Sequence, residues 1–207
     1  MNKKNYEKRQ RFFAVCGILA PIIFGLMVLI ESILRPDYSQ IYNYVSDLGV
    51  GPLSILQNIN FVVFGILSIF LSMGLRNCLK SISGKSLRTV FWLMILFSLG
   101  IIFAGIFPED FLSQNPHNLV SATAFTAIIA AQLLIWSGLK NQDNTKWAEY
   151  RKYSLFSGLL SLTLVIILKI AITYGVYPGL FQRLFLIVSW IWIGATGVKL
   201  FSLNRGS

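Results

Sequence analysis

Six long apolar runs constrain this chain more than any other feature, because each is long enough to cross a lipid bilayer. A membrane-spanning α-helix needs about 20 mostly apolar residues. The runs cover residues 12–34, 53–75, 89–107, 117–139, 153–174 and 183–201. Hydrophobic residues make up 55% of the 207 residues and charged residues only 13%, which is too apolar for a soluble domain of this length. We therefore predict an all-α, polytopic membrane protein, with one domain over residues 1–207 that forms a single bundle of six transmembrane helices.

The charges between the runs predict how the helices are oriented. Basic residues concentrate in the connectors after the second and fourth runs, which hold Arg76, Lys80, Lys85, Arg88, Lys140, Lys146, Arg151 and Lys152. Because cytoplasmic connectors carry an excess of Lys and Arg, we expect a multi-pass protein of the cell membrane with both termini cytoplasmic. The same pattern explains the net charge of +10. We therefore expect membrane lipids as partners and no nucleic acid, while oligomerisation and protein partners stay open.

The first outer connector has a pattern of its own. Ile41, Val45 and Leu48 recur at helical spacing between Pro36 and Gly49, which predicts a short interfacial helix over residues 39–48. Asp47 would lie in the last turn of that helix, where the helix dipole disfavours an anion. We therefore expect a cation or a hydrogen-bond donor beside it.

The third connector and the start of the fourth run, residues 107–121, carry acids and the only histidine. The order Asn115-Pro116-His117 is typical of an N-cap followed by proline at the first helical position. His117 would then lie in the first turn, where the positive end of the helix favours its neutral form. Ser121 follows one turn later on the same face, and Asp110 could hold the imidazole in one tautomer.

Three interpretations of this stretch remain open. In the first, His117, Asp110 and Ser121 are the catalytic residues of a membrane-embedded hydrolase or transferase. In the second, a metal binds to His117, Asp110, Asp47 and Glu31, although no HExxH motif is present; the sequence leaves the metal and any cofactor unknown. In the third, these groups form a satisfied hydrogen-bond network that closes the connectors.

Cations at the same level suggest a binding pocket. Lys169 lies about 17 residues, or on the order of 25 Å, into the fifth run, and Gln182 and Arg183 begin the sixth. Cations suit a phosphate, and acids suit an amine or a hydroxyl group. Our main expectation is an outward-facing polar pocket that binds a lipid headgroup or a small polar ligand; a hydrolase or transferase, and a structural or accessory subunit, are the alternatives. The expected pocket residues are Asp47, Asp110, His117, Ser121, Lys169, Gln182 and Arg183.

Three short motifs carry a resemblance to a known family. They are Tyr44-Val-Ser-Asp-Leu-Gly49, then Phe107-Pro-Glu-Asp110 with His117 and Ser121, and finally Gly179-Leu-Phe-Gln-Arg183. In order and placement the chain resembles the small prokaryotic integral membrane proteins grouped as domain of unknown function nine-nine-eight. The resemblance implies a fold and the location of a site, and it implies no reaction.

Overall fold

The computed structural model describes residues 2–80, 85–111, 114–140 and 145–203. Within these ranges the chain forms helices and no strand. The elements are α1 (Lys3–Leu34), the 3-10 helix η1 (Ser46–Gly49), α2 (Ser54–Leu79), α3 (Lys85–Ile106), α4 (Gln114–Leu139), α5 (Thr145–Tyr174) and α6 (Pro178–Leu203). All six α-helices are long and apolar enough to cross a membrane. The predicted all-α bundle of six spanning helices is confirmed, and the chain is a multi-pass membrane protein.

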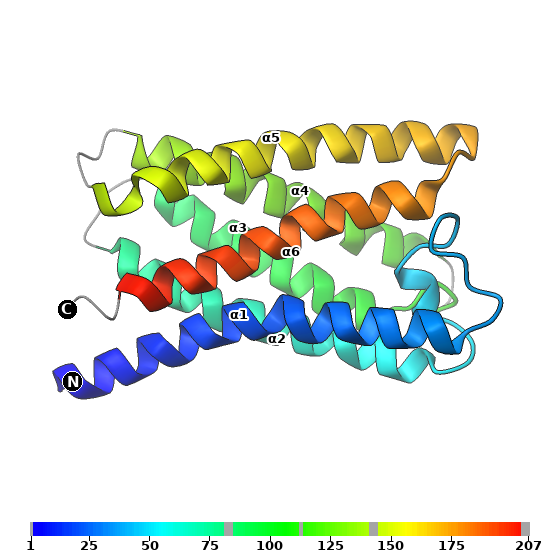
Figure 1. Cartoon of the computed structure of the whole chain (residues 1–207), viewed down its shortest axis with the longest axis horizontal. Coiled ribbons are helices and arrows are strands. Elements are labelled where there is room, and N and C mark those ends of the chain that lie inside the picture. Colours follow the sequence, from blue (N-terminus) through cyan, green and yellow to red (C-terminus); the bar gives the residue numbers. More distant parts are fainter. Residues whose placement is uncertain (1, 81–84, 112–113, 141–144, 204–207) are drawn as a thin grey trace.

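The helices form a closed ring. Each α-helix packs against the next one along the chain, and α6 returns to pack against α1. Both termini lie at one end of the bundle (Figure 1). We call the opposite end, where connectors join α1 to α2, α3 to α4 and α5 to α6, the distal end. The predicted site residues come from this end.

Aromatic rings fill the interior where α1, α2 and α6 meet. The Phe24 ring centroid lies 5.3 Å from that of Phe61, 5.0 Å from that of Phe64 and 4.9 Å from that of Trp190. Such tilted and edge-on pairs add to the packing that holds helices together where lipid supplies no hydrophobic driving force.

The connector between α1 and α2 differs from the prediction. No α-helix spans residues 39–48; the connector forms turns, and only the short η1 follows at Ser46–Gly49. Side chains compete here with the helical backbone bonds. Asp47 Oδ2 accepts the amide of Tyr44 at 2.9 Å, and a helix over residues 39–48 would direct that amide to the carbonyl of Gln40. Asp47 is therefore in the first turn of η1 and not in a last turn.

Two helix starts also differ from the prediction. The first helix begins at Lys3, well before residue 12, because Asn2 caps it by accepting the amide of Lys4 at 3.3 Å and the basic residues that follow are good helix formers. α4 begins at Gln114, so Asn115 lies inside its first turn and is not the N-cap. Pro116 remains in that turn, where its missing N–H costs no hydrogen bond. His117 is in the first turn region, as predicted.

Close approach of α1 and α6 depends on Gly197. A Cβ at this position would lie 2.7 Å from the carbonyl oxygen of Ala14 and 2.8 Å from the amide nitrogen of Ile18. These are backbone atoms, which cannot rotate away. A larger residue must push the two helices apart.

We expect Gly197→Ala to lower the free energy of unfolding in mild detergent by about 1–3 kcal/mol relative to a matched control. The control is Gly25→Ala on α1, where an added Cβ meets nothing within 4 Å. Both changes gain the same helix propensity, so their difference isolates the contact. Equal stability of the two variants would contradict the close packing of α1 on α6.

Candidate functional site

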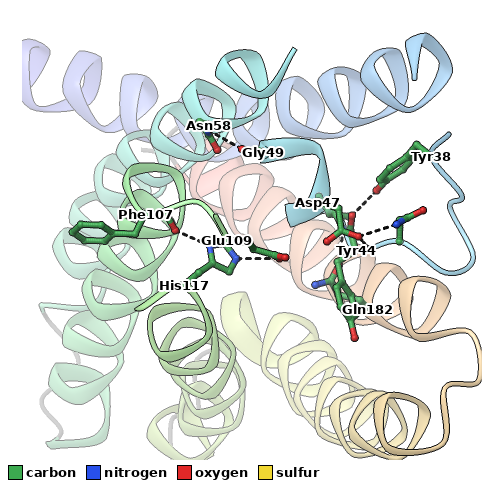
Figure 2. A network of polar contacts seen from close by, with 11 residues as sticks. Tyr38, Tyr44, Asp47, Gly49, Asn58, Phe107, Glu109, His117 and Gln182 are labelled. Atoms are coloured by element: carbon green, nitrogen blue, oxygen red, sulfur yellow. Dashed lines mark hydrogen bonds and ion pairs between the residues drawn. The ribbon is translucent and has the colours of Figure 1, made fainter. Parts of the chain in front are cut away.

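The imidazole of His117 lies between two partners from the α3–α4 connector. It is only 4% exposed, and its Nδ1 lies 2.9 Å from the carbonyl oxygen of Phe107. Because a carbonyl can only accept, Nδ1 carries a proton. Nε2 faces Glu109 Oε1 at 3.7 Å, as Figure 2 shows. One connector thus holds the ring orientation of His117 from both sides.

The acid beside His117 is Glu109 and not the predicted Asp110. Asp110 is exposed, while the Glu109 side chain is only 14% exposed and is directed at the imidazole. Phe107 and Pro108 leave α3 in a turn, closed by a hydrogen bond from the Phe111 amide to the Pro108 carbonyl. This turn decides which of two adjacent acids faces inward. Leu112 and Ser113, also in the predicted stretch, lie outside the described residues.

A cavity of about 590 Å³ opens beside this pair at the distal end. Its walls come from α4, α5, the start of α6, the α1–α2 connector and the α3–α4 connector. Polar side chains line one part, namely Tyr44, Ser46, Glu109, His117, Asn118, Ser121, Thr126, Lys169 and Gln182. Apolar side chains line the remainder, namely Ala122, Phe125, Ile129, Val165, Leu168 and Ile172. The cavity is therefore amphipathic.

Four predicted site residues meet at this cavity: His117, Ser121, Lys169 and Gln182. Their role in binding stays a prediction. Glu109, Tyr44 and Ser46 line it as well and were not predicted as site residues. Each of the three stands within a motif that the sequence already singled out. Their place in these motifs was the one feature of the sequence that could have identified them as site residues.

Arg183 lies outside the cavity lining and holds the first connector onto α6. Its Nη1 donates to the carbonyl of Asn43 at 2.6 Å and to that of Gly179 at 3.0 Å, while Nη2 donates to the hydroxyl of Tyr38. The Tyr38 hydroxyl in turn donates to the Tyr44 carbonyl at 2.7 Å. The guanidinium also lies 5.3 Å from the centroid of the Tyr38 ring. Arg183 thus uses its donors within the protein.

Asp47 also lies outside the cavity lining. Its Oδ2 accepts from Asn43 Nδ2 at 3.0 Å in addition to the Tyr44 amide (Figure 2). The expected partner is present as these two donors. A cation is close too, because Arg35 donates to the backbone carbonyl of Asp47 at 2.9 Å. Asp47 orders the connector.

Two tyrosines of this connector keep their protons at neutral pH. Burial raises the pKa of Tyr38 to about 12, although the Arg183 guanidinium acts in the opposite direction. Burial, together with the negative charges of Asp47 and Glu109, raises the pKa of Tyr44. Both phenols therefore remain neutral groups that can donate a hydrogen bond.

The arrangement limits the chemistry of the predicted catalytic group. In the described part of the chain, no hydrogen bond joins Ser121 to His117, and no hydrogen bond or ion pair joins Asp110 to the imidazole. A nucleophile, base and orienting acid are thus not assembled as a triad. The same described residues contain no group of three or more His, Cys, Asp or Glu side chains placed to hold a metal. Glu31 of the predicted metal site is fully buried in α1.

Comparison with known proteins gives one match. The sequence model of a family described as "Protein of unknown function (DUF998)" matches residues 18–199. No curated protein matches the chain, and no solved structure matches it.

We expect Arg183→Gln to loosen the first connector, because it removes charge-assisted hydrogen bonds to Asn43 and Tyr38. Amide hydrogen exchange of residues 39–47 should accelerate about tenfold, which corresponds to about 1.4 kcal/mol. Arg11→Gln, an exposed arginine at the other end of the bundle, is the control and should leave these amides unchanged. Unaltered exchange in Arg183→Gln would show that the guanidinium does not hold the connector.

Proposed function

The chain belongs to the DUF998 family of proteins of unknown function, and we propose that its distal cavity binds a membrane lipid by its headgroup, or a small polar ligand with the same charged groups. One observation carries the proposal. A single cavity joins a lysine, and a buried histidine with its glutamate partner, to an apolar wall along two spanning helices. A molecule with a charged head and an apolar tail matches both parts.

The polar part suits a headgroup that carries both signs of charge. Lys169 is exposed at the cavity and presents a compact ammonium group, which binds phosphate as a point charge. Glu109 can accept from an amine or a hydroxyl group. Ser121 and Gln182 add neutral hydrogen-bonding groups.

The apolar part suits an acyl chain. Along α4 the cavity lining extends from His117 to Ile129, a rise of about 18 Å at 1.5 Å per residue. One leaflet of a bilayer contributes about half of a hydrocarbon core that is about 30 Å thick. The lining is therefore long enough to follow a lipid tail from the headgroup level towards the middle of the membrane.

We further propose that the distal end faces outward from the cell membrane and that both termini are cytoplasmic. The support is the distribution of charge: Arg76 and Lys80 at the end of α2, and Lys3 and Lys4 at the start of α1, belong to the end opposite the cavity. An excess of cations is typical of cytoplasmic connectors. The ligand would then come from the outer leaflet or from outside the cell.

We expect Lys169→Ala to lose most of the phospholipid that copurifies with the wild-type protein, measured by native mass spectrometry in mild detergent. Removal of one phosphate-binding cation should weaken binding about tenfold. The control is Lys152→Ala, which removes an exposed lysine from the opposite end of α5. Lipid content that is equal in all three proteins would refute headgroup binding at this cavity.

The same measurement separates the alternatives. A hydrolase or transferase would convert added lipid, and the product would be absent with His117→Gln, because His117 is the base that faces the cavity. A structural or accessory subunit would neither retain lipid through Lys169 nor form a product.

Orientation has its own measurement. In a variant without Cys16 and Cys78, we expect Asp37→Cys to react with a membrane-impermeant maleimide added to intact cells, and Lys80→Cys to react only after lysis. Both positions are exposed and belong to opposite ends of the bundle. The reverse labelling pattern would invert the proposed topology.

A further inference from the structure

A stripe of polar side chains follows one face of α5 below the distal cavity. Tyr150, Ser154, Ser157 and Ser161 recur every three or four residues, and all four are buried. This spacing places them on one side of the helix. Polar groups on one buried face of a spanning helix need partners, because lipid provides none.

Two hydrogen bonds set the register between this stripe and α6. The Tyr150 hydroxyl lies 2.7 Å from Thr196 Oγ1, and Trp192 Nε1 donates to Ser154 Oγ at 3.0 Å. The two helices are antiparallel, so three more residues along each bring Ser157 opposite Ser189. The lower half of the stripe is thus hydrogen-bonded.

Gln132 of α4 lies at the level of the upper half of the stripe, which consists of Ser157 and Ser161. A Cβ added at Gly158 would lie 3.2 Å from Gln132 Cβ, so Gln132 packs against α5 at the residue that follows Ser157. Gln132, Ser157, Ser161 and Ser189 are each at most 2% exposed. Both amide atoms of Gln132 and the three serine hydroxyls lack a hydrogen-bond partner. We call these four residues the central polar cluster.

Two buried serines elsewhere in the bundle bond to their own helix, although Ser68 of α2 also lacks a partner. Ser72 Oγ donates to the Ser68 carbonyl at 2.7 Å, and Ser98 Oγ donates to the Met94 carbonyl at 2.7 Å. The serines of the central polar cluster make no such bond. A buried polar group without a partner is costly, and five such atoms on neighbouring helices indicate that another molecule binds them.

The cluster lies next to the floor of the distal cavity. Ile129 and Val165 are the deepest lining residues on α4 and α5. Gln132 follows Ile129 by three residues and Ser161 precedes Val165 by four, which is about 5 Å along each helix. A small molecule that enters the cavity therefore needs to pass only one helical turn to reach the cluster.

We propose that the central polar cluster is a second binding site, inside the bundle, for small neutral molecules that both donate and accept hydrogen bonds, of which water is the smallest. Its four side chains carry no charge, and an ion without a counter-charge is costly at this depth. An amide and three hydroxyls provide the donors and acceptors that such a molecule needs, and buried water commonly takes this role. The site does not depend on lipid binding at the distal cavity.

The test measures hydration at Ser157 by thiol chemistry. In a full-length protein without Cys16 and Cys78, Ser157→Cys is treated with the small neutral reagent methyl methanethiosulfonate. The thiolate attacks the reagent sulfur and releases methanesulfinate, and a thiolate forms only where water reaches the sulfur. The matched control is Ser98→Cys, a buried serine whose hydroxyl is already bonded. Comparable thermal unfolding temperatures establish that both variants are folded.

We expect Ser157→Cys to react at least about tenfold faster than Ser98→Cys, and Gln132→Leu, added to it, to reduce that rate towards the control. If added glycerol slows the reaction of Ser157→Cys, the site binds solutes larger than water. If glycerol leaves the rate unchanged, the ligand of the site is water. Equal rates for Ser157→Cys and Ser98→Cys, or no effect of Gln132→Leu, would overturn the proposal.

Discussion

Hydrocarbon offers a peptide backbone no hydrogen-bond partners, and the architecture of this protein depends on that constraint. Within the spanning segments the helices satisfy their own backbone groups, and the ring from α1 to α6 closes through packed side chains and close glycine contacts such as that of Gly197. In the residues that the structure describes, irregular backbone lies only at the ends of the bundle, where water or charged side chains can replace the helical bonds. At the distal end, this irregular backbone supplies part of the cavity lining.

Arginine side chains perform this replacement in the first connector. Arg35 donates to the carbonyls of Asp47 and Val50, and Arg183 donates to that of Asn43. Gln182 is on the same turn of α6 as Arg183; it accepts the Val45 amide at 2.8 Å and also lines the cavity. The fold of the connector and the shape of the cavity are therefore linked through two adjacent residues of α6. A ligand that contacts Gln182 would also contact the element that holds the connector.

Side-chain roles at the distal end were only partly predictable. Spacing along the fourth run predicted that His117 and Ser121 share a face, and depth along the fifth run predicted Lys169 at the same level; all three line one cavity. Spacing could not decide between Glu109 and Asp110, because a turn of a few residues determines which carboxylate faces inward. It also could not show that Arg183 and Asp47 use their hydrogen bonds within the connector. The predicted helix over 39–48 was wrong for a similar reason, since the Asp47 carboxylate binds the Tyr44 amide that a helix would need.

The amino-acid sequence by itself determined the helical class, the six spans and the end of the bundle that carries the polar groups. These follow from local hydrophobicity and from the need for helical hydrogen bonds in lipid, which act over about 20 residues at a time. Only the tertiary structure decided which polar groups share the distal cavity and which buried groups of the central polar cluster lack partners. Both depend on the register of α4, α5 and α6, which is set by contacts such as that between Trp192 and Ser154 across 38 residues of chain.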